Sequence, residues 1–131
     1  MTSEVRAGDV APVLLVVDDE PLIRMDLADL AEQAGFEVVE AASAAQARQI
    51  LESRRDIRVV FTDIRMPGDM DGLELAHLIR HRWPPTIIVI CSGNAEPSLE
   101  DMPSGAVFLS KPCVSAATAK LMSEIKCSVA D

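Results

Sequence analysis

Short apolar runs alternate with longer segments of helical periodicity along the whole chain. The runs are rich in Val, Ile and Leu, which is typical of strands buried on both faces, and they cover residues 12–17, 36–40, 57–62, 86–91 and 106–109. Between the runs, apolar residues recur three or four positions apart, as in the sets Ile23, Leu27, Leu30, Ala31 and Ala34; Ala47, Ile50 and Leu51; Leu75, Leu78 and Ile79; and Val114, Ala117, Leu121 and Ile125. Five strands that alternate with helices predict one α/β domain, with a parallel sheet and helices on both of its faces.

Residues with special backbone or capping roles mark several helix ends. Gly35 follows the first helical segment and is placed to end it. Ser43 followed by Gln46 predicts a capping box that opens the second helix. A loop rich in Pro, Gly and Asp covers residues 66–72 and separates the third strand from its helix. These signals place the connections, and with them the carboxyl end of each strand.

Chemically active side chains follow the strands at these ends. Open parallel sheets bind ligands beyond the carboxyl ends of their strands, and the residues there are Asp18, Asp19, Asp63, Ser92 and Lys111. Taken singly, each has an ordinary structural explanation, such as a helix cap or a turn. Their coincidence instead predicts one polar patch with three carboxylates, a hydroxyl and an ammonium. Crowded carboxylates favour a hard cation such as Mg²⁺, and an ammonium beside them can pair with a phosphoryl group.

Five motifs stand in order along the chain: Val-Val-Asp-Asp-Glu (16–20), Thr-Asp-Ile-Arg-Met-Pro (62–67), Met-Asp-Gly (70–72), Cys-Ser-Gly (91–93) and Phe-Leu-Ser-Lys-Pro (108–112). With these spacings the sequence resembles the receiver domains of two-component response regulators, from about residue 13 to residue 125. The resemblance implies a flavodoxin-like, doubly wound, five-stranded parallel sheet of strand order 2-1-3-4-5. It also implies a protein that takes a phosphoryl group from a histidine kinase or a histidine phosphotransfer protein and then controls a partner protein.

The resemblance also implies roles for the residues at the strand ends. Asp63 would be the phospho-acceptor, and Asp19 and Asp63 would bind Mg²⁺ directly together with the backbone carbonyl of Arg65. Asp18 would act on the metal mainly through water, and Lys111 would neutralise the phosphoryl oxygens. The expected chemistry is limited to phosphorylation and dephosphorylation of the chain itself, so no separate enzymatic activity is expected.

Ser92 would be the switch hydroxyl and Phe108 the switch aromatic in the same family pattern. The chain departs from that pattern at Asp69, which lengthens its loop by one residue, and at Cys113, where an aromatic residue is common. The largest departure is the stretch 93–105, which holds two prolines and two glycines. The fourth helix of the family is therefore expected to be short or distorted, with about one turn around residues 98–102. We expect phosphorylation to order residues 93–106.

Composition excludes several other classes. The 131 residues carry a net charge of −9 and only 3% aromatic residues, which argues against direct nucleic-acid binding. No apolar stretch is long enough for a membrane span, and the three cysteines, without a C-x-x-C pair, are expected to be reduced thiols in a cytoplasmic protein. The expected divisions are an N-terminal extension (1–11), the receiver domain (12–126) and a short tail (127–131), in a monomer or weak dimer.

Other assignments were weighed against the receiver. A zinc site at His77 and His81 lacks the glutamate of the metalloprotease motif. The basic residues 54–55 and 80–82 are expected to be solvated helix ends and not a nucleic-acid patch. Asp18-Asp19-Glu20 would repel a flavin phosphate and breaks the Asp-x-Asp pattern of aspartyl phosphatases. The expected form is a single-domain, stand-alone receiver, and two alternatives stay open. The chain would signal through contacts alone as a receiver-like binding module, or it would be a receiver excised from a larger regulator or hybrid kinase.

Overall fold

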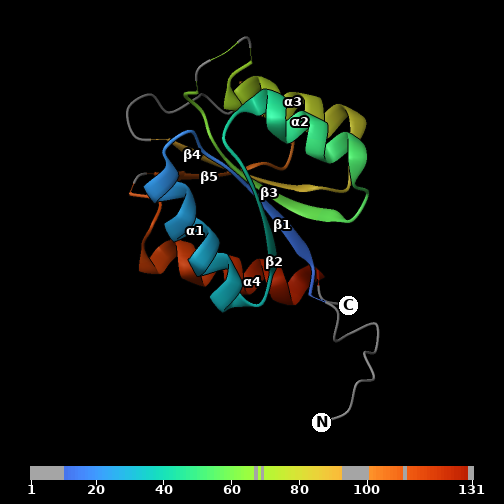
Figure 1. Ribbon diagram of the computed structural model, residues 1–131. Helices are drawn as coiled ribbons and strands as arrows, with labels where there is room; N and C mark the ends of the chain where they lie inside the picture. The colour runs from blue at the N-terminus through green and yellow to red at the C-terminus, as the bar shows by residue number, and fades with distance from the viewer. Residues whose placement is uncertain (1–10, 67, 69, 93–100, 111, 130–131) are drawn as a thin grey trace.

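The computed structural model describes residues 11–66, 68, 70–92, 101–110 and 112–129 (Figure 1). The strands are β1 (Val13–Val17), β2 (Glu37–Ala41), β3 (Ile57–Asp63), β4 (Ile87–Ser92) and β5 (Val107–Ser110). The helices of the described residues are α1 (Pro21–Ala34), α2 (Ala44–Ser53), α3 (Gly72–Arg82) and α4 (Ala116–Val129). Each expected strand is present within one or two residues of its predicted bounds.

All strand pairs are parallel, and the strand order is β2-β1-β3-β4-β5, so the predicted topology is confirmed. Strand β2 lies on one side of β1, whereas β3, β4 and β5 lie in turn on the other side. The strand order therefore reverses between β1 and β3. The carboxyl ends of these two central strands meet there, since Val17 is the register partner of Thr62. Asp63, the next residue of β3, is in turn the register partner of Cys91 on β4.

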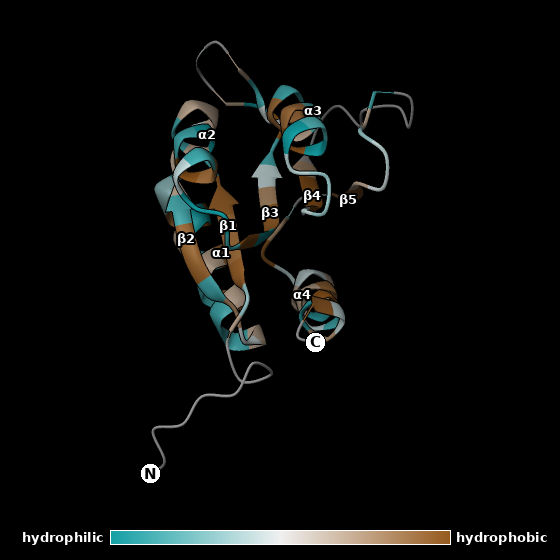
Figure 2. Cartoon of the chain, turned by 90° about the vertical axis from the view of Figure 1, so that its right-hand side faces the viewer, coloured by the Kyte–Doolittle hydropathy of each residue, from teal (hydrophilic) through white to brown (hydrophobic). Residues whose placement is uncertain are grey.

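Two hydrophobic cores lie on opposite faces of the sheet (Figures 1 and 2). Helices α1 and α4 cover one face, where they pack on Leu14 and Val16 of β1. Helices α2 and α3 cover the other, where they pack on Leu15 and Val17. Because alternate residues of β1 enter different cores, every residue of the strand is buried, which explains its unbroken apolar sequence.

Capping residues at the helix ends agree in part with the predictions from the sequence. Gly35 ends α1 with a φ of 107°, a left-handed conformation that glycine adopts without a Cβ penalty. The Ser43 side chain accepts a hydrogen bond from the Gln46 backbone N–H, as predicted for α2. The Gln46 side chain, however, accepts from the backbone N–H of Ala42, so the box is not reciprocal. A complete capping box opens α3 instead, between Asp71 and Glu74, and the sequence analysis had missed it.

The described part of the connection between β4 and β5 is a turn. Within residues 101–106, the Ala106 backbone N–H donates to the Pro103 carbonyl over 3.2 Å, and the positions expected to close a helical turn are not helical. Residues 98–100, the rest of that expected turn, lie outside the described residues. His77 Nε2 on α3 lies 2.6 Å from the Asp101 carbonyl oxygen and so joins this segment to the helix.

The last helix extends further than expected. Helix α4 continues through Val129, so the residues assigned to a tail from residue 127 begin as helix. The physical reason is the apolar face of the helix, because Val129 packs with Met122 and Ile125 in the core beside α1. A Val at this spacing extends the buried stripe by one more turn.

The cysteines differ from the sequence expectation. Cys91 and Cys113 form a disulfide with their Cα atoms 6.4 Å apart, whereas Cys127 is a free and exposed thiol. The prediction of three reduced thiols is therefore wrong for two of them. The paired cysteines lie 22 residues apart in the sequence. The adjacency of β4 and β5 brings them together, and no local spacing could reveal it.

Candidate functional site: an acidic pocket at the carboxyl ends of the strands

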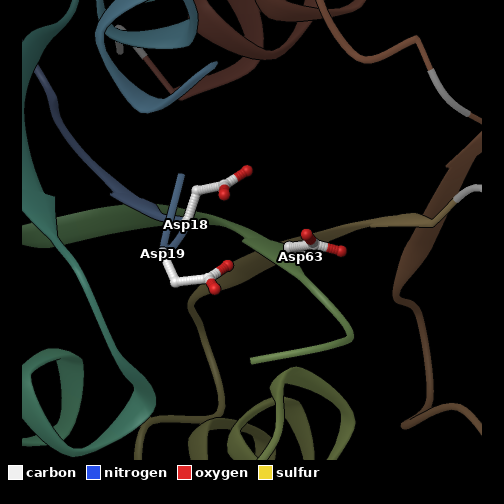
Figure 3. A group of neighbouring side chains, drawn as sticks. All are labelled: Asp18, Asp19 and Asp63. Atoms are coloured by element: carbon white, nitrogen blue, oxygen red, sulfur yellow. The ribbon is translucent and has the colours of Figure 1, made fainter. Parts of the chain in front are cut away.

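Three carboxylates converge where β1 and β3 end. Asp18 and Asp19 follow the last residue of β1, and Asp63 is the last residue of β3. A carboxylate oxygen from each lies within 4.8 Å of the others, and Figure 3 shows the three side chains turned into one space. Asp18 is 2% exposed and Asp63 is 7% exposed, so two of the three carboxylates have little access to bulk water. The structure thus brings together the three acidic residues that the sequence singled out.

Repulsion among the three carboxylates, two of which are buried, raises the free energy of the folded state. At about 4 Å, two like charges repel by roughly 4 kcal/mol at an effective dielectric constant of about 20. Three such interactions act within the pocket when Asp18, Asp19 and Asp63 are all ionised. A cation relieves this repulsion, and the all-oxygen donor set suits a hard divalent ion such as Mg²⁺. The donor chemistry of the pocket therefore fits the magnesium predicted from the sequence.

Backbone hydrogen bonds hold Asp18 in place. Its N–H donates to the Ala41 carbonyl over 3.1 Å, which continues the β1–β2 ladder by one residue. Its side-chain Oδ1 accepts from the Glu20 N–H at 2.9 Å, a turn contact two residues along the chain that precedes α1. Arg24 of α1 donates to the Asp18 carbonyl at 2.9 Å and pairs with Glu40 of β2 at 3.0 Å. Arg24, which the sequence analysis did not single out, thus fastens the first turn of α1 to the end of β1.

The backbone of Asp63 is held from the other side by Gly72. The Gly72 N–H donates to the Ile64 carbonyl at 2.7 Å, and a Cβ built on Gly72 would stand 1.7 Å from the Asp63 carbonyl oxygen. Only a residue without a side chain can approach the strand end so closely. The glycine of the Met-Asp-Gly motif therefore sets the position of α3 against Asp63. Glycine as the first residue of a helix, where it has low helix propensity, was the available signal for this contact.

The remaining predicted site residues are only partly described. The backbone of Ser92 ends β4 as the register partner of Ser110 on β5, which brings these two strand ends together. The Ser92 side chain and the whole of Lys111 lie outside the described part of the structure. Phe108 on β5 is partly buried and packs on the core beside α2 and α3. Arg65 is an exposed residue of the connection after β3, and the role of its carbonyl stays a prediction.

The arginines considered for nucleic-acid binding lie at helix ends and in ion pairs. Arg54 caps the end of α2 and pairs with Asp56 at 2.7 Å, and Arg82 in the last turn of α3 pairs with Glu52 at 2.6 Å. Hydrogen bonds from Arg82 and then Arg48 lower the pKa of Glu52. A hydrogen bond from Arg54 lowers the pKa of Asp56 in the same way. Cations at helix C-termini also interact favourably with the helix dipole, so these residues have a structural explanation.

The fold and the pocket together define a class of protein: a doubly wound α/β domain with an acidic pocket at its topological switch point. Comparison with known proteins agrees. The family pattern described as the response regulator receiver domain matches residues 14–125. The solved response regulator receiver protein from Sinorhizobium medicae has a TM-score of 0.79 and 30% identity, over 92% of this chain and 98% of that one. The receiver domain of NtrX from Brucella abortus has a TM-score of 0.76 and 32% identity, over 88% and 98% of the two chains.

Curated relatives are similar over the same region. The positive alginate biosynthesis regulatory protein of Pseudomonas aeruginosa is 39% identical over 103 residues, which is 76% of this chain and 41% of that protein. A protein-glutamate methylesterase/protein-glutamine glutaminase of Archaeoglobus fulgidus is 37% identical over 105 residues, 76% of this chain and 29% of that protein. The chain thus spans less than half the length of these relatives. It belongs to the response regulator receiver domain family, the receivers of two-component systems.

Proposed function

We propose that this chain is a phospho-accepting receiver and that Asp63 is its acceptor. The observation that carries the proposal is the convergence of Asp18, Asp19 and Asp63 within 4.8 Å at the carboxyl end of the sheet. Among these residues, Asp63 lies at the end of the central strand β3, held by Gly72. The phosphodonor is a histidine kinase or a histidine phosphotransfer protein.

Phosphoryl transfer at this site requires positioning and charge neutralisation. A carboxylate oxygen of Asp63 attacks the phosphorus of a phosphohistidine, an O–P bond forms, the N–P bond breaks, and the histidine leaves and takes up a proton. The product is an acyl phosphate on Asp63, and attack by water later returns the carboxylate and releases inorganic phosphate. Lys111, the residue after β5, pairs with the phosphoryl oxygens.

Asp19 and Asp63, with the carbonyl of Arg65, would hold Mg²⁺ directly, and Asp18 would act on it through water. The ion supplies positive charge that offsets the negative charge of the carboxylates and of the phosphoryl group. The role of Asp18 agrees with its burial and with its hydrogen bond to the Glu20 N–H, which occupies one of its two oxygens.

Phosphorylation is converted into a signal by Ser92 and Phe108. The Ser92 hydroxyl donates to a phosphoryl oxygen on Asp63, which draws the start of the β4–β5 connection inward. Phe108, partly buried in the core beside α3, turns into the space that this movement opens. This movement would order residues 93–106, of which 93–100 lie outside the described residues, and would create a surface for a downstream protein partner.

We also propose a setting for this activity. Among the described helices, none has the length and apolarity needed to cross a bilayer. We assign the domain to the cytoplasm, as a monomer or weak dimer that acts on proteins and neither binds nucleic acid nor catalyses a further reaction. The receiver comprises residues 12–126, and whether it works alone or within a longer regulator does not change its chemistry.

The decisive experiment compares Asp63→Asn with the wild type in Mg²⁺-dependent labelling by acetyl phosphate. The amide cannot act as the nucleophile, so we expect loss of the hydroxylamine-sensitive label expected of an acyl phosphate. Asp56→Asn is the matched control, because it makes the same change at an exposed carboxylate paired with Arg54. It should be labelled like the wild type.

The alternative function is a binding module that signals through contacts without phosphorylation. The same labelling experiment separates the two, since a contact-only module would take no phosphoryl group from acetyl phosphate or from a phosphohistidine donor at any Mg²⁺ concentration. Retention of most of the label in Asp63→Asn would instead move the acceptor to another residue.

A further inference from the structure

Cys91 lies directly beside the proposed phospho-acceptor. It is the register partner of Asp63 on the adjacent parallel strand, so the two residues stand at the same level of the sheet. Cys91 is 1% exposed and packs in the core with Phe61, the residue two positions before Asp63 on β3. Residues two apart on a strand face the same side. Cys91 is therefore a neighbour of the acidic pocket on the face covered by α1 and α4.

Cys113 belongs to the connection that carries Lys111. It stands three residues after the end of β5, outside regular secondary structure, and is 5% exposed. Its disulfide with Cys91 spans a Cα–Cα distance of 6.4 Å, within the range of about 4.4–6.8 Å that disulfides adopt. The bond thus joins the strand beside Asp63 to the loop that bears the phosphoryl-binding lysine.

We propose that Cys91 and Cys113 are a second, reversible covalent modification site, oxidised by peroxide and reduced by thiols, that tunes the phosphoryl-binding pocket. In the first step the Cys113 sulfur attacks a peroxide oxygen, the O–O bond breaks, and a sulfenic acid and one water form. The Cys91 sulfur then attacks the Cys113 sulfur, the S–O bond breaks and a second water leaves. Two thiols and one hydrogen peroxide give one disulfide and two waters, with two electrons passing from sulfur to oxygen. A dithiol reverses the change by thiol–disulfide exchange.

The order of these steps follows from the placement of the two sulfurs. Cys91 is fixed within β4 and shielded by the core. Cys113 lies in a loop, where local opening can expose it, whereas a central strand opens only with the whole domain. The loop cysteine therefore meets the oxidant and the strand cysteine resolves the intermediate. In a compartment whose thiols are kept reduced, the disulfide would mark exposure of the protein to oxidant.

The disulfide is expected to preorganise the phosphoryl-binding pocket. This effect rests on the proposed function of Asp63 and Lys111. The disulfide ties the segment after β5 to β4 at the level of Asp63. Lys111 stands two residues before Cys113 in the sequence, so we expect the bond to restrict the positions open to the lysine. A site that is ordered before it binds loses less entropy on binding. The oxidised form is expected to bind a phosphoryl mimic about 3- to 10-fold more tightly than the reduced form.

The first arm of the test counts thiols and does not depend on phosphorylation. Protein treated with hydrogen peroxide, then unfolded and alkylated, should carry one alkyl group, on Cys127. After reduction by dithiothreitol it should carry three. Peptide mapping should find Cys91 joined to Cys113, and three free thiols after peroxide treatment would overturn the proposal.

The second arm measures the affinity for beryllofluoride with Mg²⁺ by calorimetry, in the oxidised and the reduced wild type. These two states need no substitution, so a folding defect cannot obscure the comparison. The variant Cys91→Ser/Cys113→Ser should bind like the reduced form in both conditions. Cys127→Ser is the matched control and should keep the full difference between the two states, because this cysteine is exposed and unpaired.

The outcomes separate this inference from the proposed function. Equal affinities of the oxidised and reduced wild type, with the disulfide present, would overturn the coupling between the cysteines and the pocket. Failure of both forms to bind beryllofluoride and to take label from acetyl phosphate would refute the proposed function and, with it, the coupling. The thiol count would then still decide whether the pair is a modification site.

Discussion

Replacing Gly72 by alanine tests whether close packing of α3 sets the position of Asp63. Gly72 is the first residue of α3, where the change Gly→Ala would ordinarily stabilise a helix by about 0.5–1 kcal/mol. Here the added Cβ would lie 1.7 Å from the Asp63 carbonyl oxygen, 2.7 Å from its carbonyl carbon and 2.9 Å from the Ile64 Cα. All three atoms belong to the backbone, so no side-chain rotation can relieve the overlap.

The size of the effect follows from the displacement needed. The distance from the added Cβ to the carbonyl oxygen is shorter than a van der Waals contact by about 1.5 Å, so the two atoms would overlap. Helix α3 and the end of β3 must therefore move apart by a comparable distance. Overpacking of this kind costs about 1–3 kcal/mol, and the contact with rigid backbone places Gly72→Ala at the upper end of that range. A misplacement of about 1 Å at a reacting group can lower a rate about 100-fold. We therefore expect a loss of about 3 kcal/mol in the free energy of unfolding and roughly 100-fold slower labelling.

Two measurements check this prediction, with Gly35→Ala as the control. Urea unfolding gives the stability, and labelling by acetyl phosphate, at a temperature where every variant is folded, gives the rate. Gly35 has a φ of +107° and its added Cβ would meet only the end of the Lys126 side chain, far from the pocket along the sheet. This control should lose about 1–2 kcal/mol through backbone strain and keep its labelling rate. If Gly72→Ala stays within about 0.5 kcal/mol and threefold of the wild type, the packing argument is refuted.

Three further predictions concern the cation, acid and the switch. Millimolar Mg²⁺ should raise the melting temperature of the wild type, and Asp19→Ala should lose most of that rise, because a ligand that binds only the folded state stabilises it; an equal rise in both would count against the acidic pocket. The Arg82 hydrogen bond lowers the pKa of Glu52 in the folded state, so this ion pair adds a small amount to the free energy of unfolding. That contribution should be present above the unfolded pKa of about 4.3 and be lost as the pH falls through the folded pKa. Glu52→Gln should accordingly flatten the stability profile from urea unfolding between about pH 5 and pH 3, and an unchanged slope would contradict this ion pair. Amide hydrogen exchange of residues 93–106 should slow on binding of beryllofluoride, and strong protection before binding would favour a rigid-body shift over ordering.

The sequence by itself was enough to predict the elements and the identity of the acidic residues. Strand β1 is apolar and buried at every position, because a strand covered on both faces has no solvent-facing side, and β3 shows the same pattern over residues 59–61. Asp18 and Asp63 interrupt two such runs at the same point of the fold, where each strand leaves the core. Parallel topology places these carboxylates at the same end of the sheet, and the adjacency of β1 and β3 brings them within 4.8 Å of one another.

Contacts between distant segments depended on the tertiary structure. Arg24 reaches the carbonyl of Asp18 and the carboxylate of Glu40 from a helix whose sequence gives no reason to single it out. The extension of α4 to Val129 depends on the core that α1 offers it, since a single valine carries no information about what it packs on.

The disulfide and the Gly72 contact are the clearest examples of contacts that the sequence does not predict. Cys91 and Cys113 pair because β4 and β5 are neighbours in the sheet, and Gly72 touches Asp63 because α3 returns across the end of β3. Hydrophobic periodicity and capping motifs predict the local backbone conformation and which side chains are buried. Contacts between residues on different elements depend on strand order and register. Strand order and register bring the cysteine pair and Gly72 close to the proposed acceptor.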